Sequence, residues 1–328
     1  MSTPQPLLSA SVPAQPSPVP ANQRVIKLLV RQDARDAQRI DWLCEQIVRN
    51  RFMPVPPPEN VFVGDGDFRA IGAEFLKHFV KLGDLRPADR VLEIGCGIGR
   101  MALPLTQYLT GGTYDGMDVV PDGIDWCSRT ITPAYPAFRF HHLDVANDLY
   151  NPQGRIDPTA VTLPFRDQGF DFVLLTSVLT HLQAAEALAY AWEISRLLRP
   201  GGRCFISLFL MNDVAREGLR GGDRRLAFDP DAEGPTWLAD PAVPSAAVAH
   251  DEAFLLDVFA SVGLKPAKPA VYGTWCGRPN AVSYQDLMVL ESGGLAVTRE
   301  KRLWLALALF GGAIALVTAG LTTMATAL

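Results

Sequence analysis

The stretch Val91-Leu-Glu-Ile-Gly-Cys-Gly-Ile-Gly-Arg100 decides the fold of this 328-residue chain. It begins with an apolar run that is typical of a buried parallel strand, and glycines follow at 95, 97 and 99. Apolar residues then recur at a spacing that predicts a helix, at Met101, Leu103, Leu105 and Leu109. A strand, a glycine turn and a helix in this order predict the start of a nucleotide-binding α/β fold, because glycine allows positive φ and close approach of a ligand.

The spacing of the glycines separates two kinds of nucleotide site. A dinucleotide fingerprint needs its third glycine at position 100, which is an arginine here, and Glu93 stands two residues before the first glycine. The pattern E-x-G-x-G-x-G resembles motif I of the class I S-adenosylmethionine-dependent methyltransferases, of the type 11 and type 12 domain kind. The resemblance implies that Glu93 approaches the amino-acid end of the cofactor, and that Gly95, Cys96, Gly97 and Gly99 pass beneath it. A tight turn without a ligand is the alternative.

Two further acids follow predicted strands. Asp118 ends the strand predicted over 113–118, where a carboxylate can accept both ribose hydroxyls; Val119 follows it, and an acidic helix N-cap is the alternative. Asp144 follows the strand predicted over 138–143. The resemblance assigns Asp144 to the exocyclic amine of adenine, with the N–H of Val145 nearby.

The segment LPFRDQGFDFVLLTSVLTHL at 163–182 resembles the region around motif IV of the same family. The resemblance places the meeting point of methyl donor and acceptor at the end of this strand, with Thr176 beside the cofactor and Ser177 and His181 on the acceptor side. His181 is the side chain there that can act as a base near neutral pH. A histidine that only packs or hydrogen-bonds at a helix start is the alternative.

The remaining pattern completes the predicted domain. Helices are predicted over 68–82 with Asp67 as N-cap, 184–198 and 251–262, and strands over 202–210, 264–272 and 283–290. The long link 146–169 is predicted to line the acceptor side. The loop 272–278 either binds an acceptor or supports the core, and 211–249 fall where the family places acceptor-specific insertions. The fold implied is a three-layer Rossmann-like α/β sandwich with a seven-stranded, mostly parallel sheet whose last strand is antiparallel.

Composition divides the rest of the chain. Residues 1–22 are predicted to be a disordered Pro-rich tail, 23–60 an N-terminal helical arm, and 61–292 the methyltransferase domain. Residues 303–328 carry no charge and are long enough to span a bilayer as a C-terminal hydrophobic helix, and the basic residues just before them favour the cytoplasmic side. We therefore expect a single-pass transmembrane anchor with the domain at the cytoplasmic face of a membrane. A helix that packs on the domain or mediates oligomers is the alternative.

Charge and cysteine content exclude some functions. The formal net charge of −5 disfavours nucleic acid as a partner, and the five cysteines form no C-x-x-C pair, so no metal site is predicted. The function implied by the resemblance is transfer of a methyl group from S-adenosylmethionine to a small-molecule or lipid-linked acceptor by direct SN2 displacement. An NAD-dependent oxidoreductase and a non-catalytic membrane-tethered binding module on the same fold are the alternatives.

Overall fold

The computed structural model describes residues 39–62, 64, 66–221, 226–230 and 232–294 of the chain. Residues 39–49 are helical, which agrees with part of the arm predicted over 23–60. The described residues from Leu43 to 294 belong to one compact unit. No helix within the described ranges has the length and apolarity to cross a bilayer. The predicted tail at 1–22 and the predicted anchor at 303–328 lie outside the described residues.

The unit is built on a seven-stranded sheet with the order β3-β2-β1-β4-β5-β10-β9. Strand β10 runs antiparallel to both of its neighbours, and the other pairs are parallel. The predicted sheet and its antiparallel last strand are therefore confirmed. The strands are β1 (Arg90–Ile94), β2 (Thr113–Asp118), β3 (Phe138–His142), β4 (Phe170–Thr176), β5 (Leu198–Leu208), β9 (Leu264–Pro266) and β10 (Asp286–Ser292).

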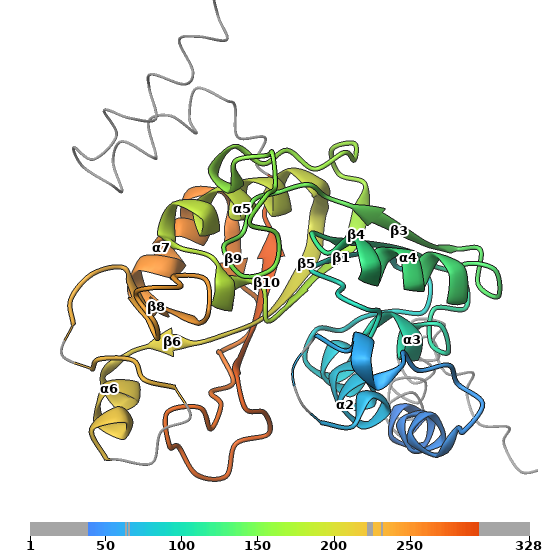
Figure 1. Cartoon of the computed structure of the whole chain (residues 1–328), viewed down its shortest axis with the longest axis horizontal. Helices are drawn as coiled ribbons and strands as arrows, with labels where there is room; N and C mark the ends of the chain where they lie inside the picture. Colours follow the sequence, from blue (N-terminus) through green and yellow to red (C-terminus); the bar gives the residue numbers. More distant parts are fainter. Residues whose placement is uncertain (1–38, 63, 65, 222–225, 231, 295–328) are drawn as a thin grey trace, which may run out of the picture. The chain divides into compact units, whose positions relative to one another are not determined.

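Helices cover both faces of this sheet, which completes the three layers (Figure 1). One group lies on each side: α2 (Phe68–Lys81), α3 (Ala102–Leu105) and α4 (Pro121–Thr130) against α5 (Ala184–Leu197) and α7 (Glu252–Ser261). The predicted cap of α2 is confirmed, since the Asp67 carboxylate accepts the N–H of Ala70 at 2.7 Å. The short 3₁₀ turns are η1 (Pro58–Asn60), η2 (Pro158–Ala160) and η3 (Leu179–His181).

Three predicted elements differ from the structure. The helix after the glycine turn is reduced to the four residues of α3, because Pro104 cannot donate an N–H to the carbonyl of Arg100. Helix α2 packs closely against the Arg100 carbonyl oxygen, since a Cβ on Gly72 would lie 2.5 Å from it. The strand predicted over 264–272 ends at Pro266 because proline lacks the ladder donor. The strand predicted over 202–210 begins earlier, because β5 runs over Leu198–Leu208.

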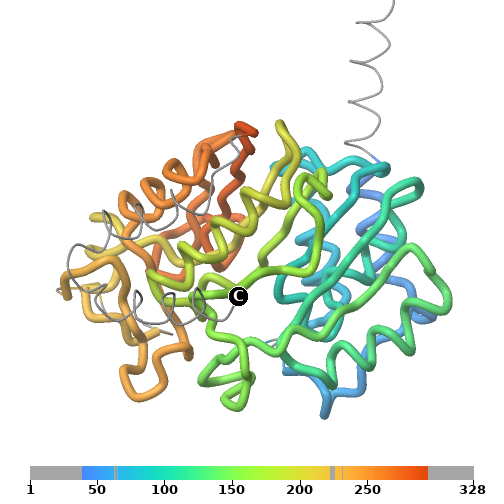
Figure 2. The backbone as a smooth tube through the Cα atoms, turned by 90° about the horizontal axis from the view of Figure 1, so that it is seen from above, coloured from blue at the N-terminus to red at the C-terminus, as the bar shows by residue number. Residues whose placement is uncertain are grey.

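The segment 211–249 and its surroundings form a second, smaller sheet with the order β6-β8-β7. Its strands are β6 (Leu210–Met211), β7 (Thr236–Leu238) and β8 (Val248–Asp251), and α6 (Asp213–Arg220) lies beside them. A separate aromatic core that includes Phe209, Phe228, Trp237 and Trp275 supports this sheet. Seen from above, the chain after about residue 200 gathers on one side of the unit, away from β1, β2 and β3 (Figure 2).

The loop 272–278 supports this second core. Trp275 is buried and donates its Nε1–H to Asp286 at 2.8 Å, and the Arg278 guanidinium lies 4.4 Å from the centre of the Tyr272 ring. Of the two roles that the sequence left open for this loop, the structure favours support of the core.

Candidate active site

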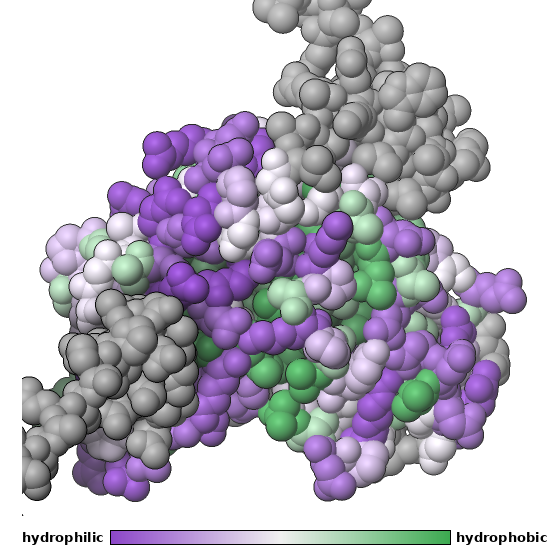
Figure 3. Space-filling view, turned by 180° about the vertical axis from the view of Figure 1, so that it is seen from behind, coloured by the Kyte–Doolittle hydropathy of each residue, from purple (hydrophilic) through white to green (hydrophobic). Residues whose placement is uncertain are grey.

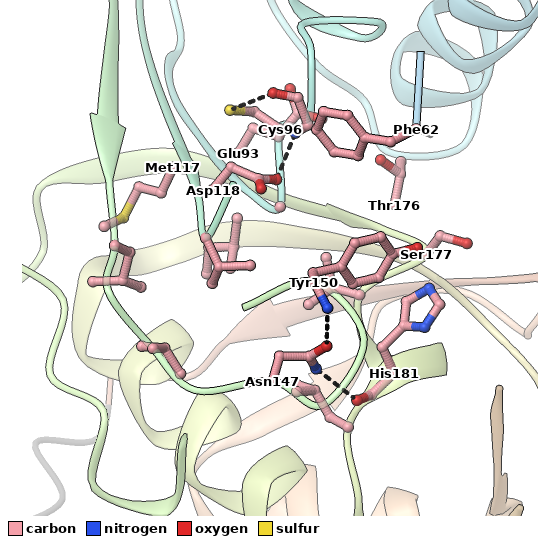
Figure 4. Close-up of a pocket in the computed structure, with 18 of the residues that line it drawn as sticks. Phe62, Glu93, Cys96, Met117, Asp118, Asn147, Tyr150, Thr176, Ser177 and His181 are labelled. Atoms are coloured by element: carbon pink, nitrogen blue, oxygen red, sulfur yellow. Dashed lines mark hydrogen bonds between the residues drawn. The ribbon is translucent and has the colours of Figure 1, made fainter. Parts of the chain in front are cut away.

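A cavity of about 330 Å³ opens at the carboxyl ends of β1, β2 and β4. The strand order reverses between β1 and β4, and ligands of open α/β sheets bind at such a switch point. Figure 4 shows Glu93, Cys96 and Asp118 grouped at one part of the cavity and Asn147, Tyr150, Ser177 and His181 at another. We call the first group the turn side and the second group the histidine side.

The glycine turn forms the floor of the turn side. Gly95, Cys96 and Gly97 line the cavity, and Gly95 has φ +77°. A Cβ on Gly95 would lie 2.3 Å from Cγ2 of Val178, so only glycine fits there. Gly99 is not among the lining residues; a Cβ on it would lie 2.9 Å from Sγ of Cys127. Of the four residues predicted to pass beneath the cofactor, those at 95–97 line the cavity. Gly99 instead allows α4 to pack closely against the turn.

Glu93 is an acid buried at the wall of this cavity, with 1% of its surface exposed. Its carboxylate accepts the Tyr114 hydroxyl. Burial raises the pKa of Glu93 to about 8, and the nearby Asp118 charge adds to this, while bonds from Tyr114 and Thr176 and the Arg100 charge oppose it. A cation placed beside Glu93 would favour its charged form. The site is therefore suited to a positively charged ligand group.

Asp118 closes the turn side from the end of β2. Its carboxylate accepts the N–H of Gly97 at 2.6 Å and the N–H of Val120 at 2.9 Å. Burial raises the pKa of Asp118, and these two bonds oppose that rise. The alternative of a helix N-cap does not hold, because the N-cap of α4 is Val120. Asp118 and Val119 both line the cavity, so this carboxylate fixes the glycine turn and also faces the ligand space.

Asp144 does not join the other two acids. It is absent from the cavity lining, and its carboxylate pairs with Nε of Arg155 at 2.5 Å and accepts from Nδ2 of Asn151 at 3.3 Å. The cause is the link after β3, which returns past Asp144 and pairs Val145 with Ile156 in a β-bridge. The predicted contact of Asp144 with adenine is therefore not favoured by this geometry. Val145, in contrast, lines the cavity as predicted.

The end of β4 supplies Thr176 and Ser177 to the cavity wall. Ser177 has φ +64°, a left-handed conformation that costs a non-glycine residue free energy. Contacts from β5 and from the residue before β10 hold it there: its N–H donates to Oγ of Ser207 at 2.9 Å, and Nε2 of Gln285 donates to its Oγ. The turn between donor and acceptor positions is therefore fixed by distant parts of the chain.

His181 lines the histidine side, and its ring has a defined tautomer. Nδ1 lies 2.7 Å from the carbonyl oxygen of Ser245. A carbonyl only accepts, so Nδ1 carries the proton and Nε2 carries the lone pair. Burial lowers the pKa of His181, which the bond to Ser245 opposes in part, so the imidazole is neutral near pH 7. The edge-to-face ring of Tyr150, 5.1 Å away between centroids, also fixes its orientation.

Several lining residues were not predicted individually. The link 146–169 contributes Ala146, Asn147 and Tyr150, and the loop before α2 contributes Phe62 and Gly64. The unusual length of the link was the signal available in the sequence. Arg100, which replaces the third glycine of a dinucleotide fingerprint, also lines the cavity and donates to the carbonyl of Gly64 at 3.3 Å. Within the described ranges, no group of three or more His, Cys, Asp or Glu side chains could hold a metal ion.

Comparison with known proteins identifies a methyltransferase domain in this chain. A family model described as a methyltransferase domain matches residues 92–206. The chain is 34% identical over 113 residues to a fatty-acid O-methyltransferase of Mycolicibacterium smegmatis, covering 34% of each protein. It is 28% identical over 129 residues to a sterol 24-C-methyltransferase of Schizosaccharomyces pombe, covering 39% of this chain and 30% of that protein. The match thus spans about a third of the length of these curated relatives.

Solved structures align with this chain at low sequence identity. A Burkholderia thailandensis 1,6-didemethyltoxoflavin-N1-methyltransferase, solved with S-adenosylhomocysteine, aligns with a TM-score of 0.43 and 18% identity over 80% of this chain and 89% of that chain. The motifs and the match together identify residues 92–206 as a methyltransferase domain of the class I S-adenosylmethionine-dependent kind. S-adenosylmethionine is the cofactor of that family.

The residues of the cavity fit this cofactor. Its amino-acid end carries an ammonium and a carboxylate, and the turn side offers Glu93 and Arg100, which lie close enough for their charges to interact. Its ribose carries two hydroxyls, and Asp118 is a carboxylate at the end of β2 that faces the same space.

Proposed function

We propose that this chain transfers a methyl group from S-adenosylmethionine to a small or lipid-linked acceptor by direct SN2 displacement. One observation carries the proposal: two carboxylates, Glu93 and Asp118, face one cavity across the glycine turn. A pyrophosphate would be repelled by Asp118 and would oppose ionisation of Glu93, whereas an ammonium or a sulfonium would be attracted by Asp118 and would favour the charged form of Glu93. This argues against the NAD-dependent oxidoreductase alternative.

The proposed roles follow the two sides of the cavity. Glu93 binds the ammonium of the cofactor, Arg100 its carboxylate and Asp118 its ribose hydroxyls. When bound, the cofactor supplies an electrophilic methyl group. Ser177 and His181 form the acceptor position, where His181 can take a proton through Nε2. Exclusion of water by the apolar wall and alignment of the acceptor contribute to the rate.

Calorimetry tests the cofactor assignment directly. We expect S-adenosylhomocysteine to bind and NADH to give no heat. Asp118→Asn should weaken S-adenosylhomocysteine binding about 10- to 100-fold, since bonds to a charged group contribute about 1.5–3 kcal/mol. Asp122→Asn, an exposed acid in the first turn of α4, is the matched control and should bind normally. Heat with NADH and none with S-adenosylhomocysteine would refute the proposal.

Surface and sequence observations support a lipid-linked acceptor. The named relatives act on a fatty acid and a sterol. Leu149, beside the lining residue Tyr150, is 46% exposed, and Figure 3 shows apolar side chains gathered at the middle of one face within a hydrophilic border. Labelled methyl donor incubated with membrane and soluble extracts tests turnover. Binding of S-adenosylhomocysteine without transfer to any extract would favour the non-catalytic binding module.

We further propose that residues 303–328 form a single-pass anchor that holds the domain at the cytoplasmic face of a membrane. The support is the sequence alone: 26 residues without charge after the basic residues Arg299, Lys301 and Arg302. The full chain should resist alkaline extraction from membranes, and Ile314→Arg should release it. Protease added to the outside of intact cells should leave the domain uncut. Cleavage of the domain, or release of the unsubstituted chain at high pH, would contradict this proposal.

A further inference from the structure

The two sides of the cavity differ in charge. Among the described residues that line it, the Asp, Glu, Lys and Arg side chains are Glu93, Arg100 and Asp118, and all three come from β1, the glycine turn or the end of β2. Arg100 is engaged there with the Gly64 carbonyl and the Glu93 charge. The histidine side is lined by neutral polar groups and apolar groups, including Asn147, Tyr150, Leu182 and Tyr190. A cofactor therefore uses the fixed charges, and an acceptor meets an uncharged wall.

This wall does not suit a charged acceptor. An acceptor carboxylate there would leave water with no Arg or Lys side chain beside it, and an ionised group without a partner is costly to bury. Tyr150 and Tyr190 do not supply charge, because burial raises the pKa of both phenols. The neutral His181 does not act as a counter-ion either.

The nitrogen base among the described residues of the histidine side is Nε2 of His181, which presents a lone pair. The Ser245 carbonyl fixes it by holding the proton on Nδ1, and Ser245 lies between β7 and β8 in the acceptor-specific segment of the chain. A second contact, from β8, fixes the turn that carries His181: Nε2 of the buried His250 lies 2.8 Å from the Leu179 carbonyl, to which it donates. A ligand group that meets Nε2 must donate a hydrogen.

We infer that the acceptor atom is the oxygen or nitrogen of a neutral hydroxyl or N–H group on an apolar skeleton, and that Nε2 of His181 takes its proton. This inference rests on the proposed methyl transfer. The new bond forms between the acceptor atom and the methyl carbon as the carbon–sulfur bond breaks, with both electrons of that bond going to sulfur. The proton passes from the acceptor to Nε2, and the imidazolium then returns it to solvent. An acceptor carboxylate, which has no proton to lose, is excluded as the substrate class.

The bond that holds the transferred methyl tests the acceptor class. The full chain is incubated with S-adenosylmethionine carrying a labelled methyl group and with lipid and small-molecule extracts. Hydroxide releases the label from a methyl ester as methanol, whereas hydriodic acid releases it from O-methyl and N-methyl groups that resist hydroxide. We expect label that resists hydroxide and is released by hydriodic acid. Label released by hydroxide, or by neither reagent, overturns the inference and leaves the proposed methyl transfer intact.

A matched pair of variants tests the role of His181. His181→Asn keeps an N–H donor near the Nδ1 position for Ser245 but lacks the Nε2 base, so kcat should fall about 100- to 1,000-fold. The affinity for S-adenosylhomocysteine should stay within about twofold, which shows that the fold and the cofactor site are intact. His181→Gln, which can present an amide near the Nε2 position, should be equally slow because an amide is not a base.

The pH profile separates a base from a structural histidine. In the unsubstituted protein, kcat/KM should rise with pH through a pKa below 6.5 and then level off, because the neutral imidazole is the active form. The Asn variant should lack that limb. An Asn variant that keeps its rate refutes the base, whereas loss of S-adenosylhomocysteine binding by the unsubstituted chain refutes the proposed function and the inference together.

Discussion

Two buried acids, Glu93 and Asp286, sit on strands of the same sheet and have different surroundings. Glu93 is 1% exposed and Asp286 is 0% exposed. Asp286 accepts four donors: the N–H groups of Leu210 and Gly273, Nε1 of Trp275 and, at 3.4 Å, Nη1 of Arg278. Glu93 accepts the hydroxyls of Tyr114 and Thr176 and faces a cavity.

The difference separates a structural acid from a binding acid. The donors around Asp286 come from two segments, β6 and the loop 272–278, and join β10 to the second sheet, so its capacity is filled by the protein. Burial raises the pKa of both acids, but the backbone and indole donors oppose that rise at Asp286. Glu93 keeps capacity for a further partner. Burial alone therefore does not identify a functional carboxylate; the source of its donors does.

The largest expected effect is on stability. Asp286→Ala should lower the free energy of unfolding by about 3–5 kcal/mol, because it leaves the partly buried Arg278 guanidinium without its carboxylate partner and the Trp275 N–H without its acceptor. Urea titration measures this. Asp257→Ala, at an exposed site on α7, is the control and should stay within about 0.5 kcal/mol. If Asp286→Ala lowers the free energy of unfolding by no more than the control does, Asp286 is not a structural acid.

The second effect should appear in binding and not in folding. Glu93→Gln should weaken S-adenosylhomocysteine binding about 10- to 100-fold, since an amide cannot pair with the ammonium. The same substitution should not lower the free energy of unfolding, in contrast to Asp286→Ala. The folded pKa of Glu93 is raised to about 8 from 4.5, so the unsubstituted protein loses stability as pH rises from about 4.5 to 8.

The glutamine variant lacks that loss, so it should be at least as stable at pH 6 and more stable than the unsubstituted protein at pH 9. Urea titrations at the two pH values measure this. A variant that is less stable at both values, as Asp286→Ala should be, would place Glu93 with the structural acids.

A third, smaller effect is proton release on binding. At pH 7.5 an acid with a pKa of about 8 is mostly protonated, and a bound ammonium favours its charged form. Binding of S-adenosylhomocysteine should then release up to about three quarters of a proton. Calorimetry in phosphate and in Tris measures it from the difference in apparent enthalpy. Glu93→Gln should bind with no release, and equal release by both proteins would assign the proton to another group.

The sequence predicted those parts of the molecule that depend on neighbours along the chain. The glycine turn, the acids at 93 and 118 and the antiparallel last strand lie where the pattern placed them. The second sheet was not predicted because β6 and β7 have two and three residues, too few to show a period. Its strands exist through packing around residues such as Phe228 and Trp275, which come from distant segments.

Features of the site that depend on long-range contacts could not be predicted from the sequence either. The tautomer of His181 is fixed by a carbonyl 64 residues away, and Ser177 is held by Gln285, 108 residues away. The position of Asp144 at a strand end suggested a ligand contact, but the carboxylate pairs with Arg155 in a link whose path the pattern did not show. A motif thus predicts where a side chain lies on a strand or helix, but it does not predict which residue that side chain contacts.

The smallest expected effect is at Asp144, and it tests the comparison at its weakest point. Asp144→Ala should change the affinity for S-adenosylhomocysteine by less than about twofold, because this acid is engaged outside the cavity in a pair whose arginine is largely exposed. Arg155→Ala is the matched control: it frees the Asp144 carboxylate without removing it. If Asp144→Ala weakens binding tenfold and Arg155→Ala does not, the carboxylate reaches the cofactor in the complex. The predicted adenine contact would then hold, and an acid satisfied by a protein partner could still bind ligand.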